Sequence, residues 1–75
     1  MESQKERVLD FMREHDGITS MEAFTELGIM RISARIADLR ADGHIIASKR
    51  ESGYNRYGEK TNYVRYVLHE VGINS

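Results

Sequence analysis

The sequence has no cysteine among its 75 residues. A disulfide framework and a thiolate zinc site are therefore both excluded, so packing and helix capping must supply the stability of the fold. A chain this short buries only about 60% of the surface that its unfolded form exposes, which leaves room for one core. We expect a single domain over residues 1–75, with its core over about 4–69 and residues 70–75 as a tail outside that core.

The sequence also lacks a long apolar run. Its first seven residues are polar or charged after the initial methionine, where a secretory signal peptide needs an apolar segment. No stretch approaches the roughly 20 apolar residues that a membrane span requires. These observations predict a soluble protein of the cell interior with no membrane partner.

A large excess of charge of one sign is absent as well, since the formal net charge is −1. The two parts of the chain differ, however. Residues 1–27 hold three basic and seven acidic side chains, whereas residues 28–75 hold eight basic and five acidic ones. Binding of nucleic acid by bulk charge is not expected, but a basic face forms if the cations of the second part converge in space.

A first helix is predicted over about residues 4–15. Ser3 and Glu6 have the spacing of a capping box, in which the serine hydroxyl and the glutamate carboxylate satisfy backbone N–H groups of the first turn. Asp16-Gly17 offers a left-handed stop after His15. Apolar residues recur between these ends at helical spacing, and we assign Met12 to the core.

Two further helices follow after a very short linker. Thr19 and Glu22 repeat the capping-box pattern, Phe24 is assigned to the core, and Gly28 ends the second helix. The third helix begins near residue 31 and is closed by Gly43. Its apolar stripe consists of Ile29, Ile32, Ile36 and Leu39.

Beyond residue 43 the apolar pattern changes from helical to alternating. Residues 46–51 and 63–68 have the period of strands, with Ile46, Ser48 and Arg50 on one side of the first. Residues 52–61 contain two glycines and an asparagine and are predicted to form a long hairpin loop. Three helices, the last two joined by a glycine-containing turn, followed by a two-stranded β-hairpin wing, predict an α+β fold of the winged helix-turn-helix type.

Three segments carry a resemblance to a known family, and they are Gly17-Ile18-Thr19-Ser20-Met21-Glu22-Ala23, Leu27-Gly28-Ile29 and Ala34-Arg35-Ile36-Ala37-Asp38-Leu39-Arg40-Ala41-Asp42-Gly43. The chain resembles the small winged helix-turn-helix proteins of bacteriophages and prophages over roughly residues 4–69. The resemblance implies the fold, a phage or prophage origin and hence the cytoplasm of a bacterial host cell. Members of that family are mostly presumed DNA binders, and small phage proteins of this fold also include inhibitors of host proteins.

Duplex DNA is the partner that the pattern favours. If the third helix enters a major groove, its outward alanines let the backbone approach closely, and three side chains near its N-terminal half reach base edges or phosphates, namely Arg31, Ser33 and Arg35. A structural role competes for two arginines of this helix. Arg35 has the spacing to pair with Asp38, and Arg40 has the position to cap carbonyls or to lie over the core.

The hairpin supplies a second group of candidate DNA contacts, in which basic and aromatic side chains alternate. They are Lys49, Arg50, Tyr54, Arg56 and Lys60, with Arg65 and Tyr57 beside them. Such a mixture suits phosphate contacts and insertion into a minor groove. The alternative is an ordinary solvated loop, because Glu51 and Glu59 neutralise part of its charge.

A protein partner is the alternative to DNA. The outward face of the third helix also suits packing against another protein, since it is small and apolar at Met30, Ala34, Ala37 and Ala41. One version is a homodimer. A homodimer also belongs to the DNA hypothesis, in which a second copy doubles a small footprint and the apolar residues of Val71-Gly72-Ile73 contribute to the contact. The other is a phage-encoded inhibitor or adaptor of a host protein such as a defence nuclease. Its candidate DNA-mimicking surface is the acidic row Glu2, Glu6, Asp10 and Glu14, which otherwise serves solubility.

No enzymatic activity, cofactor, metal or small-molecule substrate is predicted. Residues 53–61 have glycines and a lysine in common with a phosphate-binding loop, but Glu59 interrupts the pattern and no helix follows it. His15, His44 and His69 occur singly, without a partner at metal-ligand spacing. A chain of this length also leaves little volume for a substrate pocket. The leading hypothesis is therefore a transcriptional regulator of phage or prophage genes.

Overall fold

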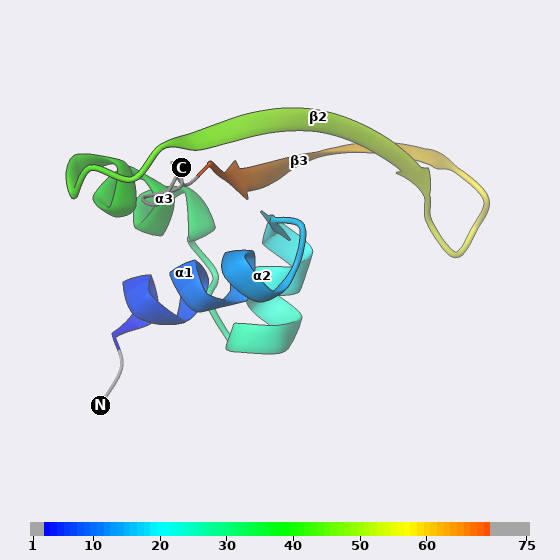
Figure 1. Ribbon diagram of the computed structural model, residues 1–75. Coiled ribbons are helices and arrows are strands. Elements are labelled where there is room, and N and C mark those ends of the chain that lie inside the picture. Colours follow the sequence, from blue (N-terminus) through cyan, green and yellow to red (C-terminus); the bar gives the residue numbers. More distant parts are fainter. Residues whose placement is uncertain (1–2, 70–75) are drawn as a thin grey trace.

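The computed structural model describes residues 3–69. The elements in chain order are α1 (Gln4–Glu14), β1 (Ile18–Thr19), α2 (Ser20–Leu27), α3 (Ile32–Ala41), β2 (Ile46–Tyr54) and β3 (Lys60–Leu68). The three helices gather on one side of the sheet, and the two long strands continue past them as a hairpin (Figure 1). The predicted order of three helices and a hairpin is confirmed. Glu2 and the predicted dimer contact Val71-Gly72-Ile73 lie outside the described residues.

Capping boxes start the first two helices, as their sequences predict. The Ser3 Oγ accepts from the Glu6 N–H at 3.3 Å, and the Glu6 carboxylate accepts from the Ser3 N–H at 2.9 Å. Thr19 and Glu22 repeat this exchange at 3.1 and 3.0 Å. Each box satisfies N–H groups that the helix itself leaves without a partner, so both starts are fixed by the local sequence.

The predicted left-handed stop at the end of α1 is wrong. The helix ends at Glu14, and its cap residue His15 is extended, with φ of −127°. Gly17 does have a positive φ of +122°, but it is buried against β3, where an added Cβ would lie 2.6 Å from the Tyr66 carbonyl oxygen. This glycine therefore permits a close approach of two backbones instead of ending a helix.

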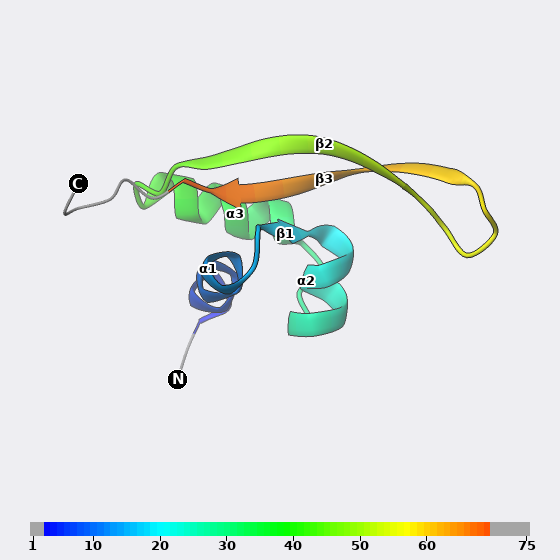
Figure 2. The ribbon, with the colours of Figure 1, turned by 45° about the vertical axis from the view of Figure 1, so that its right-hand side comes forward.

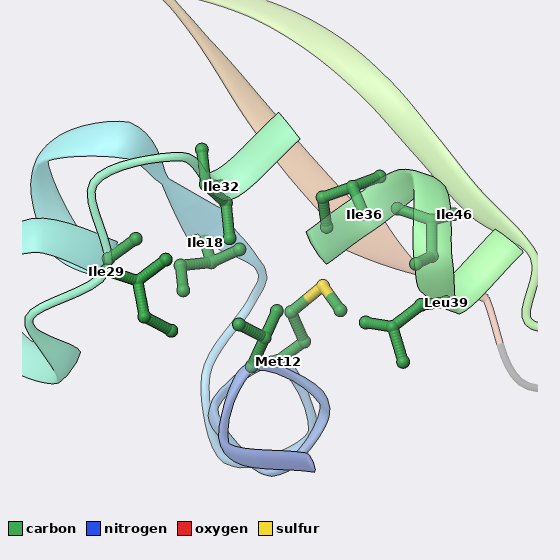
Figure 3. Packing of buried hydrophobic residues seen from close by; sticks show 9 residues of the cluster. Met12, Ile18, Ile29, Ile32, Ile36, Leu39 and Ile46 are labelled. Atoms are coloured by element: carbon green, nitrogen blue, oxygen red, sulfur yellow. The ribbon is translucent and has the colours of Figure 1, made fainter. Parts of the chain in front are cut away.

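One apolar core joins all three helices to the sheet (Figure 3). Its buried members are Val8, Met12, Ile18, Ala23, Ile29, Ile32, Ile36, Leu39 and Ile46. The assignment of Met12 to the core is confirmed, and that of Phe24 is wrong, because 54% of its surface is exposed. In the short helix α2 the side chain that points into the core is that of Ala23. Phe24 is the next residue, so its side chain is rotated by about 100° around the helix axis and points toward solvent.

The sheet has three antiparallel strands in the order β1-β3-β2. The two-residue strand β1, which the sequence did not predict, pairs Ile18 with Tyr66 and Thr19 with Arg65. The pairing of β2 with β3 runs from Ile46 opposite Leu68 to Tyr54 opposite Lys60. The predicted loop over residues 52–61 is therefore wrong at both ends, and only 55–59 connect the strands. Solvent reaches both sides of the outer hairpin, so its strands carry no apolar alternation.

Candidate nucleic-acid interface

The hairpin has two chemically different faces. Successive side chains of a strand point to opposite sides of the sheet. Every second residue of β2 counted from Ile46, and of β3 counted back from Leu68, therefore points to the side of the core. We call this side of the hairpin the inner face, and it consists of Ser48, Arg50, Ser52, Tyr54, Lys60, Asn62, Val64 and Tyr66. The outer face consists of Lys49, Glu51, Gly53, Thr61, Tyr63 and Arg65. The predicted grouping of Arg50 with Ile46 and Ser48 is thereby confirmed.

Arg40 joins the base of the hairpin to α3. Its guanidinium donates to the Ile46 carbonyl oxygen at 2.7 and 3.1 Å and to the Ser48 Oγ at 3.2 Å. The structural role predicted for Arg40 as an alternative is thus confirmed. From this junction β2 runs back along α3, from the C-terminal end of the helix toward its N-terminal end, before it passes beyond the helices (Figures 1 and 2). Arg40 therefore places the start of the inner face beside the C-terminal part of α3.

The exposed side of α3 carries only part of the predicted set. Arg31 and Ser33 are exposed at its N-terminal end, where Arg31 is the cap residue. Arg35 turns toward α1 instead, because it donates to the Gln4 side chain at 3.1 Å and forms an ion pair with Asp38 at 3.1 Å. The structure therefore separates Arg35 from the other two candidate contacts of this helix.

On the same side, the C-cap residue of α3 forms an ion pair with α1. The Lys5 Nζ lies 2.7 Å from the Asp42 carboxylate. This hydrogen bond lowers the pKa of Asp42 and raises the pKa of Lys5 from their ordinary values. The flank toward α1 is thus closed by paired charges, and the side toward the hairpin is left open.

The tip of the hairpin is braced by Asn55. Its Oδ1 accepts from the backbone N–H groups of Tyr57 and Glu59 at 2.9 and 3.0 Å, and its Nδ2 donates to the Glu59 carboxylate at 3.1 Å. The Gly58 N–H donates to the Asn55 carbonyl at 3.0 Å, and Gly58 has φ of +78°. An asparagine followed three residues later by glycine is the signal for such a turn. The turn fixes Arg56 and Tyr57 at its corner.

The basic side chains of the hairpin are divided between its faces. Arg50 and Lys60 lie on the inner face and Arg56 at the tip, all exposed, and none of the three forms an ion pair with a residue in the range 3–69. Lys49 lies on the outer face. The outer Arg65 is only 22% exposed and is paired with Glu51 at 3.0 Å and Glu22 at 3.1 Å. The hydrogen bond from Arg65 lowers the pKa of Glu51.

Exposed methionines and carboxylates are present elsewhere on the surface. The exposed fraction is 80% for Met30 and 69% for Met21. Carboxylates of α1 form an exposed row at Glu6, Asp10 and Glu14, although Asp10 lies 3.9 Å from Arg13. The described residues include no cluster of side chains suited to a metal ion, and none of their helices has the length and apolar character to cross a membrane.

Comparison with known proteins gives one match. A family model described as a winged helix-turn-helix domain matches residues 3–71. No curated protein and no solved structure matches the chain. The family match covers nearly the whole sequence and agrees with the order of helices and strands in the structure.

Proposed function

This chain belongs to the winged helix-turn-helix family, and from that membership we propose that it binds duplex DNA through α3 and the inner face of the hairpin. Winged helix-turn-helix domains are typically DNA-binding modules without enzymatic activity. The proposal is compatible with a formal net charge of −1, since Arg31, Arg50, Arg56 and Lys60 are exposed and form no ion pair within residues 3–69. Affinity then depends on the local potential of that face rather than on the charge of the whole protein.

The observation that carries this proposal is a set of exposed cations without ion pairs within residues 3–69, which lie on α3, on the inner face and at the tip of the hairpin. Arg31 stands at the start of α3, Arg50 and Lys60 line the inner face, and Arg56 stands at the braced tip. Cations without protein partners are available to phosphate oxygens, whereas Arg65 is already neutralised by two carboxylates.

The two parts of this surface have different roles in the proposed complex. α3 lies in the major groove, where Ser33 and the small side chains beside it allow close contact with base edges. Arg50, Lys60 and Arg56 contact phosphates. Near the tip, Arg56 and Tyr54 also reach the adjacent minor groove. Lys49 is left out of the interface, because it lies on the opposite face of the same strand.

The test compares DNA binding by variants of two neighbouring residues of β2, which lie on opposite faces, and of Arg56 at the tip. Fluorescence anisotropy of a labelled duplex is measured over a range of salt concentrations for the wild type, Arg50→Gln, Arg56→Gln and Lys49→Gln. Each variant removes one positive charge from the hairpin. The slope of log affinity against log salt is expected to become shallower by about 0.9 in Arg50→Gln and in Arg56→Gln, because one phosphate contact is lost, and to stay unchanged in Lys49→Gln.

Equal effects of Arg50→Gln and Lys49→Gln would show that only overall charge matters and would refute the proposed interface. Absence of binding by the wild type at low salt would refute DNA binding itself. The duplex is first a random sequence, because nonspecific affinity rests on the same phosphate contacts.

Within this proposal the protein acts as a transcriptional regulator that occupies its site as a homodimer. The surface of one protomer that carries unpaired cations is small, and a second copy doubles the number of phosphate contacts. The resemblance to bacteriophage and prophage proteins directs the search for specific sites to phage and prophage genes. Sedimentation of the protein with and without duplex measures the stoichiometry, and a 1:1 complex would refute the dimer.

A host protein is the second candidate partner, and the exposure of Met30 at 80% favours it. An exposed methionine next to the start of α3 offers an apolar contact that DNA phosphates do not require. If the wild type binds no duplex, the expected result is capture of a bacterial protein that a Met30→Glu variant fails to capture. Capture by both proteins would exclude this surface.

A further inference from the structure

Arg65 lies where the hairpin leaves the rest of the sheet. In the part of the chain that the structure describes, β1 pairs with β3 only at Tyr66 and Arg65. Beyond Arg65 the two strands of the hairpin have no third strand beside them, and a groove of about 510 Å³ separates the start of α2 from the outer part of β3. The direction in which the hairpin leaves the helices is therefore set close to Arg65.

The side chain of Arg65 connects three elements. From β3 its Nε donates to the Glu51 carboxylate on β2 at 3.0 Å, and its Nη1 donates to the Glu22 carboxylate on α2 at 3.1 Å. Hydrogen bonds between two charged groups are stronger than neutral ones, and the planar guanidinium fixes their directions. The Arg65 side chain is 22% exposed, so its ion pair with Glu22 is partly shielded from solvent.

Glu22 gives this connection a fixed anchor. The same Oε1 atom that accepts from Arg65 also accepts from the Thr19 N–H at 3.0 Å, within the capping box of α2. Thr19 lies directly opposite Arg65 in the sheet. The stem of Arg65 also passes close to Gly17, where an added Cβ would lie 3.0 Å from the Arg65 Cγ. Arg65 is thus tied to the residues that begin the helix-turn-helix.

We infer that Arg65 is a positioning residue, which fixes the angle between the hairpin and α2 and so aligns Arg50, Arg56 and Lys60 with α3. The inference rests on the proposed DNA binding. Arg65 acts without touching DNA, because it lies on the outer face and two carboxylates occupy its guanidinium. Loss of the connection leaves the hairpin less ordered, and DNA binding must then restore that order at a cost in affinity.

Glu22→Gln tests this role through the sign of its effect. Glutamine serves in a capping box as glutamate does, so the start of α2 is kept while the charge that holds Arg65 is lost. Removal of a carboxylate by itself strengthens attraction to phosphates. We expect the opposite, a fall in affinity for duplex DNA of roughly threefold to thirtyfold. The matched control is Glu26→Gln on the same helix, for which affinity stays equal or rises.

A distance measurement tests the same role without DNA. Because the chain has no cysteine, spin labels attach only at introduced sites, Thr25→Cys on α2 and Tyr57→Cys at the tip. The distribution of distances between the labels is expected to broaden when Glu22→Gln or Arg65→Gln is added and to stay unchanged with Glu26→Gln. The thermal transition of each variant confirms that it is folded.

An unchanged distance distribution in Glu22→Gln, or DNA binding by Glu22→Gln as tight as that by Glu26→Gln, overturns the role of Arg65. If the wild type itself binds no DNA, the proposed function fails, and the distance distribution alone decides whether Arg65 positions the hairpin.

Discussion

Among the glycines within residues 3–69, Gly17 has the least room for an added methyl group. Its φ of +122° is a backbone angle that residues with a side chain rarely adopt, and a Cβ at this position would lie 2.6 Å from the Tyr66 carbonyl oxygen. Gly17→Ala is expected to lower the free energy of unfolding by about 3 kcal/mol, measured by urea denaturation, because both the backbone strain and the clash must be relieved.

Gly58→Ala is the matched control for this substitution. Gly58 also has a positive φ, of +78°, but no atom lies near the position of its Cβ. Only the backbone strain remains there, so a loss of roughly 1 kcal/mol is expected. Equal losses of stability in Gly17→Ala and Gly58→Ala would show that the close approach of β3 is not the reason why position 17 requires glycine.

The lowered pKa of Glu51 makes the free energy of unfolding depend on pH. Its hydrogen bond from Arg65 holds the pKa of the folded carboxyl below its ordinary value of 4.5. The unfolded chain therefore binds the proton more readily, and the stabilisation is present above pH 4.5 and lost as the pH falls through the folded pKa. Urea denaturation should show Glu51→Gln to be less stable than the wild type at pH 7, with the difference shrinking toward pH 3.

Glu26→Gln is the comparison for this pH series. Glu26 is exposed and forms no ion pair with any residue between 3 and 69, so Glu26→Gln should change the free energy of unfolding at pH 7 by less than about 0.5 kcal/mol. A stability difference between Glu51→Gln and wild type that is the same at pH 7 and pH 3 would contradict the assignment.

At the scale of single elements, the junction of α3 with β2 depends on one side chain. Arg40 donates twice to the Ile46 carbonyl and once to Ser48. Arg40→Ala is expected to lower the free energy of unfolding by about 1–2 kcal/mol, because charge-assisted hydrogen bonds to a carbonyl next to the core are lost. Thermal unfolding measures the change. Arg7→Ala, an exposed arginine of α1 without such a partner, should change stability by less than about 0.5 kcal/mol.

The helices could be predicted from the sequence because their signals are local. Capping boxes at Ser3 and Thr19, and Gly28 with its φ of +69°, act within a few residues of the helix ends they define. The apolar stripe of α3 likewise repeats within one element. These parts of the fold were predicted within a few residues.

The missed features depend on contacts between distant residues. β1 has only two residues and exists because β3, more than 40 residues later, pairs with it. Residues 52–54 and 60–62 are strand because β2 and β3 pair there. Their sequence has no alternation of apolar residues from which a strand could be predicted. For the candidate site, alternation placed Arg50 on the inner face, but no local pattern indicated that Glu22 and Glu51 would neutralise Arg65.

At the scale of the whole molecule, the long hairpin sets the size of the proposed DNA site. The longest dimension of the protein is 44 Å, and at 3.4 Å per base pair this length corresponds to about 13 base pairs. We expect affinity for duplexes of increasing length to level off near this value for one protomer. A plateau reached with much shorter duplexes would mean that α3 or the hairpin does not contact DNA.

The separation of the two faces of the hairpin bears on how this protein can diverge. Arg65 and Glu51, which connect the hairpin to α2, lie on the outer face, and the exposed Arg50, Ser52 and Asn62 lie on the inner face of the same strands. Substitutions at Arg50, Ser52 and Asn62 therefore alter recognition while leaving the core and the Arg65 connection intact. A lineage that carries this fold is free to acquire new binding preferences by changes at these positions, and a combinatorial library at the same three sites would consist largely of folded proteins.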